Sequence, residues 1–202
     1  MTLLRSKAAL ALLLTLGYAL LTIAIYLAHA RWFAVDVVFY SALLDAVIAA
    51  VAMAVVLVLV GRVYTAFEKV LLVCVWLLGG YAFAISGPAV LDRSLSFYIL
   101  EKLQQRGGGV RAHAIGPIFV NEYMPEFRLV DVRLTEQLQS GTIVIENGCV
   151  KLTPKGEALA TLSRYIRTHF MPRHRLLAGE YTDALVDPFA QSPTGEMGYE
   201  CK

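Results

Sequence analysis

Charged residues are scarce in this chain: they make up 17% of its 202 residues, whereas hydrophobic residues make up 57%. With a mean hydropathy of +0.60, the chain is too apolar for an ordinary soluble domain. The scarcity of charge is greatest near the N-terminus, where three long apolar runs cover residues 8–28, 37–60 and 70–90. Each run has roughly the 20 residues that a helix needs to cross a ~30 Å hydrocarbon core. Residues 1–90 are therefore predicted to form three transmembrane helices.

A cleaved signal peptide is the alternative interpretation of the first run. Arg5 and Lys7 form a basic segment before it, and Ala28-His29-Ala30 resembles a cleavage site. However, the run is longer than the roughly 7 to 15 apolar residues of a signal peptide. Trp32, just beyond the run, is also typical of an aromatic anchor at the membrane interface. We therefore expect the first run to remain as a membrane helix.

Enzyme and metal-site motifs are missing as well. The sequence contains no G-x-S-x-G, no phosphate-binding loop, no H-E-x-x-H and no cysteine pair with zinc spacing. Gly107-Gly108-Gly109 follows no predicted strand and opens no helix that carries a lysine, so it is interpreted as a connector. We expect a protein that is not an enzyme and that needs neither a cofactor nor a metal.

Cysteine is rare, with three residues in the chain. Cys74 lies in a membrane run, and Cys201 lies in a predicted tail. No disulfide framework is visible, so Cys149 is expected to have no partner and a reducing compartment is favoured.

Small residues mark one face of the second membrane helix and part of the third. They allow helix backbones to approach closely, so this face is predicted to pack against another helix. The predicted packing residues are Ala42, Ala46, Ala49, Gly80 and Ala84.

Asp45 lies about two turns into the second apolar run. A carboxylate at this depth must find a polar partner or a wet cavity. Ser41 and Tyr40 are its nearest candidates in the sequence. One interpretation is a hydrogen bond within the bundle, and the other is an intramembrane polar contact with a partner protein or lipid. A small transporter or enzyme that uses Asp45 is a weaker third hypothesis, because no relay of further ionisable residues is visible.

The polar half of the chain predicts three helices, a hairpin and a further helix. The first helix begins near Asp92 or Ser94, either of which can cap it, and ends at the three glycines. The second covers residues 111–123 and is interrupted at Gly116-Pro117, and the third covers residues 127–139. The apolar residues expected to point inward from the third helix are Phe127, Val130, Leu134 and Leu138.

Two β-rich runs follow, at residues 142–146 and 149–153, around Asn147-Gly148. This pair favours the type I′ turn of a tight hairpin. Pro154 then suits the first position of a last helix. Apolar residues recur along that helix at helical spacing, at Leu159, Leu162, Tyr165, Ile166 and Phe170.

The stretch LTEQLQSGTIVIENGCVKLTPKGEAL resembles the core of winged-helix domains of the MarR and PadR type. In such domains a recognition helix ends at a glycine, a two-stranded wing follows, and a phrase like Leu152-Thr153-Pro154-Lys155-Gly156 leads into the last helix. The expected fold is a mainly α membrane protein with a small α+β winged-helix domain at residues 91–178. An acidic, flexible tail is expected at residues 179–202. Since this fold serves both DNA and protein binding, it does not identify the activity.

The charge of the expected winged helix argues against DNA binding. Residues 92–202 carry 13 basic and 13 acidic side chains. DNA affinity depends largely on cationic contacts with phosphates, so a neutral region with Glu146 at the wing tip is a poor candidate. The resemblance implies a contact surface formed by Arg128, Arg133, Gln137, Glu146 and Lys151.

A second basic cluster lies near the end of the last predicted helix. Membrane surfaces attract such segments by about 1 kcal/mol per charge. The candidates for contact with lipid head groups are Arg164, Arg167, Arg173 and Arg175. A solvated helix face is an equally good interpretation of this cluster.

Together these features predict a non-enzymatic accessory or regulatory subunit of a bacterial inner membrane. Its partners are expected to be membrane lipids and either a membrane protein or a second copy. The alternative is a membrane-tethered winged-helix transcription regulator that binds DNA. Basic residues near the spans are balanced between the two sides. We place the C-terminal domain in the cytoplasm, because winged helices are mostly intracellular and Cys149 has no evident partner.

Overall fold

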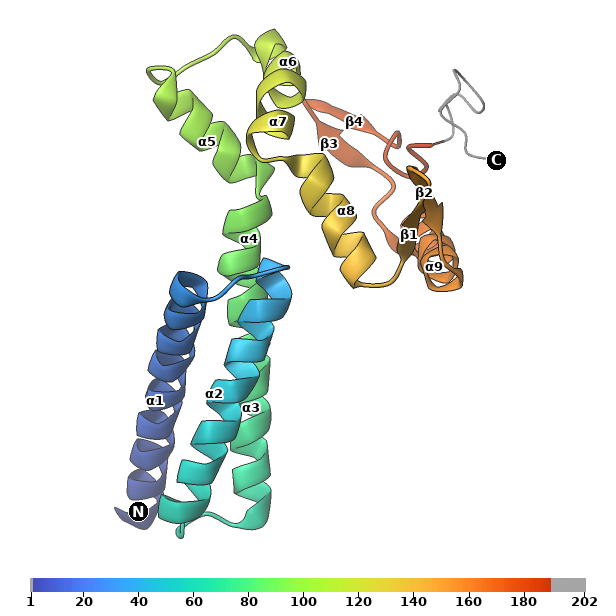
Figure 1. Ribbon diagram of the computed structural model, residues 1–202. Coiled ribbons are helices and arrows are strands. Elements are labelled where there is room, and N and C mark those ends of the chain that lie inside the picture. The colour runs from blue at the N-terminus through green and yellow to red at the C-terminus, as the bar shows by residue number, and fades with distance from the viewer. Residues whose placement is uncertain (1, 190–202) are drawn as a thin grey trace. The chain divides into compact units, whose positions relative to one another are not determined.

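The computed structural model describes residues 2–189 and is mostly helical, at 71%. Its three longest helices are α1 (Thr2–Trp32), α2 (Val38–Val60) and α3 (Ala66–Ser86), which run side by side (Figure 1). All three are long and apolar enough to cross a membrane, as the apolar runs predicted. The chain forms two compact units, one ending at Leu129 and one beginning at Val130.

Small residues allow the three helices of the first unit to pack closely. Gly80 shows the requirement most directly, because a Cβ atom there would overlap the Tyr18 hydroxyl and the Cβ of Ala46. Around this contact, Trp76 stacks on Tyr18 with ring centroids 5.7 Å apart and donates a hydrogen bond of 3.0 Å to Thr15. The structure buries all five predicted packing residues: Ala42, Ala46, Ala49, Gly80 and Ala84.

Polar contacts hold one end of the bundle. The Lys7 ammonium lies 3.0 Å from the Glu68 carboxylate, and the Tyr64 hydroxyl donates to the carbonyl of Lys7 at 2.6 Å. Thr65 and Glu68 form a capping box that starts α3. The beginning of α1 therefore lies at the same end of the bundle as the α2–α3 connection.

The first unit continues beyond the bundle with short helices. α4 (Pro88–Arg93) is followed by α5 (Leu95–Gln105), whose first turn is capped by Ser94, the hydroxyl of which accepts from the Phe97 N–H at 3.2 Å. Asp92 belongs to α4, so of the two predicted caps the structure uses Ser94. Burial of Tyr98 from α5 against Ile118 and Tyr123 forms a small second core.

The segment between the glycine connector and Phe127 is helical without a break at Gly116-Pro117, so the predicted interruption is wrong. Pro117 causes no break because it stands near the start of a helical turn, where a missing N–H is tolerated. The irregularity lies further on, in a π-helical turn. The successive elements are η1 (Ala112–Ala114), α6 (Ile115–Ile118), η2 (Phe119–Tyr123) and α7 (Met124–Glu126).

The second unit contains the predicted helix, hairpin and helix. α8 (Leu129–Gln139) leads to β1 (Ile143–Glu146) and β2 (Cys149–Leu152), and α9 (Pro154–Phe170) follows. Asn147 and Gly148 both have positive φ, 52° and 78°, which confirms the predicted type I′ turn. Gly156 packs the start of α9 on the base of the hairpin, because a Cβ there would overlap the carbonyl of Thr142.

A second hairpin follows α9 and was not expected. β3 (Arg175–Leu177) pairs with β4 (Glu180–Thr182) in antiparallel register. Ala178 and Gly179 at its turn have φ values of 50° and 99°. The boundary predicted between residues 178 and 179 thus falls inside a turn, and β4 lies in the expected flexible tail. Residues 190–202 of that tail, Cys201 among them, lie outside the described residues.

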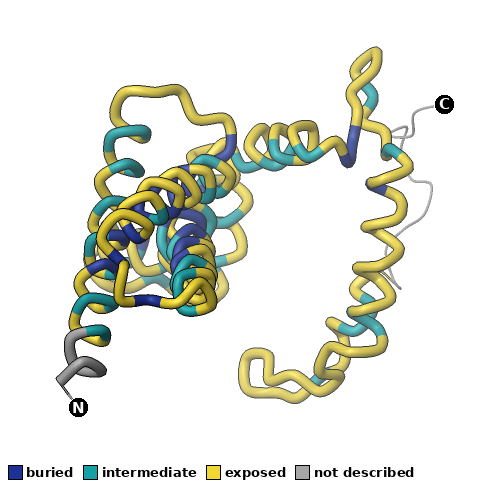
Figure 2. The backbone as a smooth tube through the Cα atoms, turned by 90° about the horizontal axis from the view of Figure 1, so that it is seen from below, coloured by how far each residue is buried: buried dark blue, intermediate teal, exposed yellow. Residues whose placement is uncertain are grey.

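Burial differs greatly between the elements. Figure 2 shows buried residues gathered along the membrane bundle and mostly exposed residues in the second unit. No side chain of α8 is buried, and the predicted inward positions Phe127, Val130 and Leu138 are exposed. Among the described residues of the second unit no core forms on this side of α8, whereas Phe127, which belongs to the first unit, packs against the rings of Tyr98 and Tyr123 with centroids 5.5 and 5.0 Å apart. The order of elements agrees with the winged-helix resemblance, whereas a shared winged-helix core is absent among residues 130–189.

Candidate functional sites

Asp45 and His29 form a polar pair inside the membrane bundle. Asp45 is 1% exposed, and its Oδ1 lies 2.7 Å from Nδ1 of His29 on α1. Ser41 and Tyr40 were the partners considered from the sequence, because they are close to Asp45 along the chain. His29 lies near the end of α1 and Asp45 near the start of α2, so the two meet when these consecutive helices pack as antiparallel neighbours.

The contact with His29 gives one of the two Asp45 carboxylate oxygens, Oδ1, a hydrogen-bond partner. Its Oδ2 is buried and has no hydrogen-bond partner. The His29 ring also packs edge-on against Phe33, with centroids 5.6 Å apart. Burying a carboxylate is costly unless it is paired, so His29 compensates for part of the cost of placing Asp45 here. Because Asp45 faces α1, it is not displayed to a protein that docks on the outside of the bundle.

A groove of ≈ 220 Å³ runs between α1 and α3. Gly79 and Gly80 lie along its α3 side, and Thr22 and Ile23 lie along its α1 side. A Cβ on Gly79 would meet no atom within 4 Å, in contrast to Gly80. Gly79 thus leaves open space at the bundle surface, at a depth where a lipid chain or a partner helix is the neighbour.

A cluster of charged residues in the first unit was missed from the sequence. Lys102 Nζ lies 2.8 Å from Glu126 and 3.0 Å from Glu122, and Glu122 also binds Arg106. The hydrogen bonds from Glu126 and Glu122 hold the pKa of Lys102 well above its ordinary value. The same bonds lower the pKa of both carboxylates. A possible signal was the matching i, i+4 spacing of the two bases and of the two acids.

Most residues of the predicted winged-helix contact surface are engaged with neighbours. Arg133 pairs with Glu136 at 2.9 Å, and Lys151 pairs with Glu146 at 3.3 Å. Gln137 accepts a hydrogen bond from the Thr142 hydroxyl through its backbone carbonyl, at 3.0 Å. The fifth residue of the predicted surface, Arg128, belongs to the first unit and has a positive φ of 44°.

The hairpin β1–β2 has two unlike faces. Its register pairs Val144 with Lys151 and Glu146 with Cys149, so these side chains share one mixed face. The other face is aliphatic throughout. Three of its residues are exposed: Ile145 by 44%, Val150 by 47% and Leu152 by 56%. Ile143 at the base of this face is buried.

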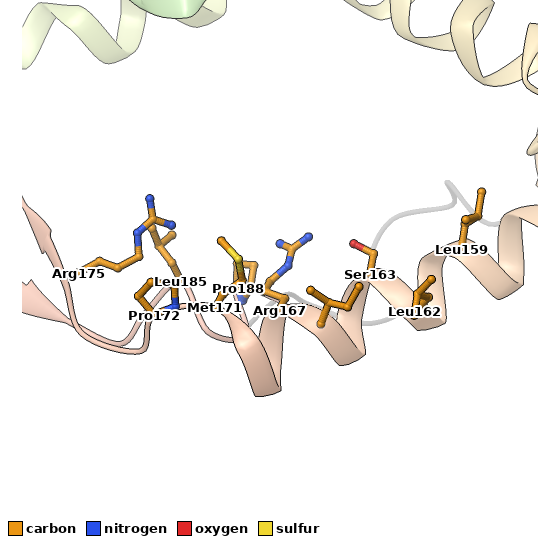
Figure 3. Close-up of a pocket in the computed structure, with 10 residues that line it drawn as sticks. Leu159, Leu162, Ser163, Arg167, Met171, Pro172, Arg175, Leu185 and Pro188 are labelled. Carbon is orange, nitrogen blue, oxygen red and sulfur yellow. The ribbon is translucent and has the colours of Figure 1, made fainter. Parts of the chain in front are cut away.

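The predicted lipid-contact arginines lie in and after α9. Arg164 lies 3.1 Å from Asp187, and the Arg167 guanidinium lies 6.0 Å from the ring centroid of Phe189. Arg173 is exposed in the connection after α9, and Arg175 begins β3. Arg167 and Arg175 both line one groove, in which Arg175 lies at one end and Arg167 near the middle, with Leu159 and Leu162 at the other end (Figure 3).

Cys149 is disulfide-bonded, so the expectation of an unpartnered thiol is wrong. Sequence spacing alone does not identify a disulfide, because pairing depends on how the fold brings two cysteines together. Cys74 is a free cysteine in α3. Since disulfides persist in oxidising compartments, one of the two reasons for a cytoplasmic C-terminal domain is removed.

No group of three or more His, Cys, Asp or Glu side chains that could hold a metal ion occurs among residues 2–189. The pairs and surfaces described above are therefore the polar and apolar features from which a function can be argued. Comparison with protein-family models, with curated proteins and with solved structures finds no match for this chain.

Proposed function

We propose that the chain is a non-enzymatic accessory or regulatory subunit of a membrane complex. Its three helices anchor it in the membrane, and the winged-helix-like segment from α8 to α9 contacts a partner protein. The observation that carries this proposal is the aliphatic face of the β1–β2 hairpin, where Ile145, Val150 and Leu152 are exposed together. Exposed apolar patches with polar surroundings mark sites of protein association.

The charges near the hairpin favour protein over DNA as the partner. A wing that contacts the DNA backbone needs free cations, whereas Lys151 is paired with Glu146 and Arg133 with Glu136. Exposed aliphatic side chains gain little from contact with phosphates. The tethered transcription regulator therefore remains the less favoured alternative. We expect the full chain in detergent to cause no salt-dependent retardation of duplex DNA, and retardation with a steep salt dependence would reverse this ranking.

Within the membrane, the groove between α1 and α3 is the proposed docking position for a partner helix. Its Gly79 side offers room for close approach of another backbone. Asp45 plays an internal role in this proposal, since it is buried and bonded to His29.

We also infer that the C-terminal region lies on the oxidising side of the membrane, opposite to the placement predicted from the sequence. The disulfide at Cys149 supports this side. The distribution of basic residues supports it too, because long translocated domains count little in the positive-inside rule. In the N-terminal segment and the two short loops, one side has Arg31 and the other has Arg5, Lys7, Arg62 and Lys69, while Arg93 and Lys102 follow α3 on the side of Arg31.

Site-specific photo-crosslinking tests the protein contact. A photoreactive residue at Val150 on the aliphatic face should give a discrete adduct with a neighbouring protein when the full chain is produced in its native membrane. The matched control is Val144 on the mixed face of the same strand pair. Equal adducts from both positions, or none from Val150, would contradict the proposed docking face.

Thiol labelling tests on which side of the membrane the C-terminal region lies. In a Cys74→Ala variant, membrane-impermeant reductant followed by an impermeant thiol reagent should label intact cells, and omission of the reductant should prevent labelling. Labelling that requires permeabilised cells would return the C-terminal region to the cytoplasm.

A further inference from the structure

Helix α9 exposes a continuous apolar face. Leu159, Leu162, Ile166 and Phe170 share one side of the helix, and they are exposed by 47%, 51%, 43% and 72%. Polar residues such as Thr161 and Arg164 occupy the opposite side. A helix with one apolar and one basic face, exposed in this way, has the form of helices that lie in a membrane interface.

A groove continues the apolar face past the end of α9. It has a volume of ≈ 520 Å³ and is lined mostly by apolar side chains, which include Met171, Pro172 and Leu185. Figure 3 shows Arg167 and Arg175 extending toward the same open side of this groove, with Met171 and Pro172 between them. An apolar floor with one cation at its end and another near its middle suits an anionic amphiphile.

Charge around the face is one-sided. Residues 158–179 contain four arginines and two histidines but neither Asp nor Glu. Acidic groups border this segment at Glu157 and at Glu180, which pairs with Leu177 across the β3–β4 hairpin, and Asp187 lies 3.1 Å from Arg164 on the polar side. Arg167, Arg173 and Arg175 are left to give the segment a positive potential.

We propose that α9 and the following segment dock on the surface of an anionic phospholipid membrane. The apolar face enters the boundary between head groups and acyl chains, and Arg167 and Arg175 bind lipid phosphates. The positive charge of this segment favours anionic lipid over a second copy of the chain, because a second copy would place its own arginines against these arginines. The three anchoring helices also keep a membrane surface at high local concentration. This docking is independent of the protein contact proposed for the hairpin.

Photo-crosslinking in vesicles tests the proposal with the full chain. A photoreactive residue replaces Ile166 on the apolar face or, as the matched control, Thr161 on the polar face. Each protein is reconstituted in vesicles of phosphatidylcholine alone or mixed with phosphatidylglycerol. We expect phospholipid adducts at Ile166 to exceed those at Thr161 and to increase with phosphatidylglycerol. Equal adducts at both positions, adducts to a second protein chain, or indifference to phosphatidylglycerol would overturn the proposal.

The arginines are tested in the same vesicles. Arg167→Gln and Arg175→Gln should each lower the adduct yield at Ile166 by up to about fivefold, since each charge contributes about that factor to surface binding. Arg164→Gln is the control, because Arg164 is paired with Asp187, and it should change the yield less. A larger loss from Arg164→Gln than from the other two would contradict the assigned roles. The comparison of the two lipid mixtures needs no arginine variant, so it stands even if a variant fails to fold.

Discussion

The membrane bundle and the helices of the second unit use apolar residues in opposite ways. In the bundle, alanine and glycine bring backbones together, so that Trp76 and Leu57 are almost fully buried. In α9, larger apolar residues such as Ile166 and Phe170 remain exposed. The bundle therefore packs its helices on one another and leaves outer side chains such as Leu20 exposed along helices long enough to cross a membrane, whereas the second unit exposes the apolar faces of α9 and the hairpin. Substitutions should consequently affect stability in the bundle and association in the second unit.

The largest effect on stability is expected from His29→Ala. Removal of this partner leaves the buried Asp45 carboxylate without the hydrogen bond of 2.7 Å. Leaving a buried carboxyl group without its hydrogen-bond partner costs up to about 3 kcal/mol, and more when the group is charged. Unfolding of the full chain in mixed detergent micelles should show a destabilisation of this order. The double variant His29→Ala, Asp45→Asn should recover part of the loss, and equal stability of His29→Ala and the unmodified chain would show that the pair contributes nothing.

A smaller loss is expected from Gly80→Ala, with Gly79→Ala as its neighbour and control. The added methyl at Gly80 would overlap Tyr18 and Ala46, whereas at Gly79 it meets open space. Overpacking of this kind costs about 1–3 kcal/mol. Thermal unfolding in detergent should therefore separate the two variants, with Gly79→Ala as stable as the unmodified chain. If both variants lose the same stability, helix propensity or lipid packing determines the outcome rather than the α1–α2–α3 contact.

Acid should loosen the charged cluster at Lys102. The pKa values of Glu122 and Glu126 are lowered in the folded chain. Their stabilisation is therefore present above the ordinary carboxyl pKa of 4.5 and is lost as the pH falls through the lower, folded value. The protection factors of the α5 amides against hydrogen exchange should fall in that acidic range. Lys102→Gln should weaken this pH dependence. An unchanged pH profile in this variant would show that the cluster does not cause the pH dependence.

The raised pKa of Lys102 affects the stability of the cluster at alkaline pH. Its contribution is complete below the ordinary value of 10.5 and is lost as the pH rises through the higher, folded value. The protection factors of the α5 amides, which correct the exchange rate for its intrinsic dependence on pH, should thus be insensitive to pH between neutrality and the ordinary lysine pKa.

The smallest effect on stability is expected from Leu162→Ala in α9. Leu162 is exposed and packs on no buried core, so its truncation should change the free energy of unfolding by about 0.5 kcal/mol or less. The matched variant is Leu57→Ala in the bundle, where Leu57 is buried and the loss should be about 2 kcal/mol or more. Equal losses would mean that α9 contributes to the folded core, and the contrast between the two regions would fail.

Local sequence signals were sufficient for the elements themselves. The apolar runs predicted α1–α3 because a membrane helix is specified by length and composition alone. Asn147-Gly148 predicted its turn because both residues tolerate positive φ. The small-residue face of α2 was also visible, since helical spacing places Ala42, Ala46 and Ala49 on one side.

Partners distant in the chain were determined by the tertiary structure. His29 meets Asp45 from another helix, and Lys102 meets Glu126 from beyond the glycine connector. Helical spacing identifies an apolar face on α8 and α9 but not what covers it, because periodicity reports the direction of a side chain and not its neighbour. Burial of Asp45 and exposure of Phe170 were therefore decided by which elements pack together, a long-range property that local propensity does not contain.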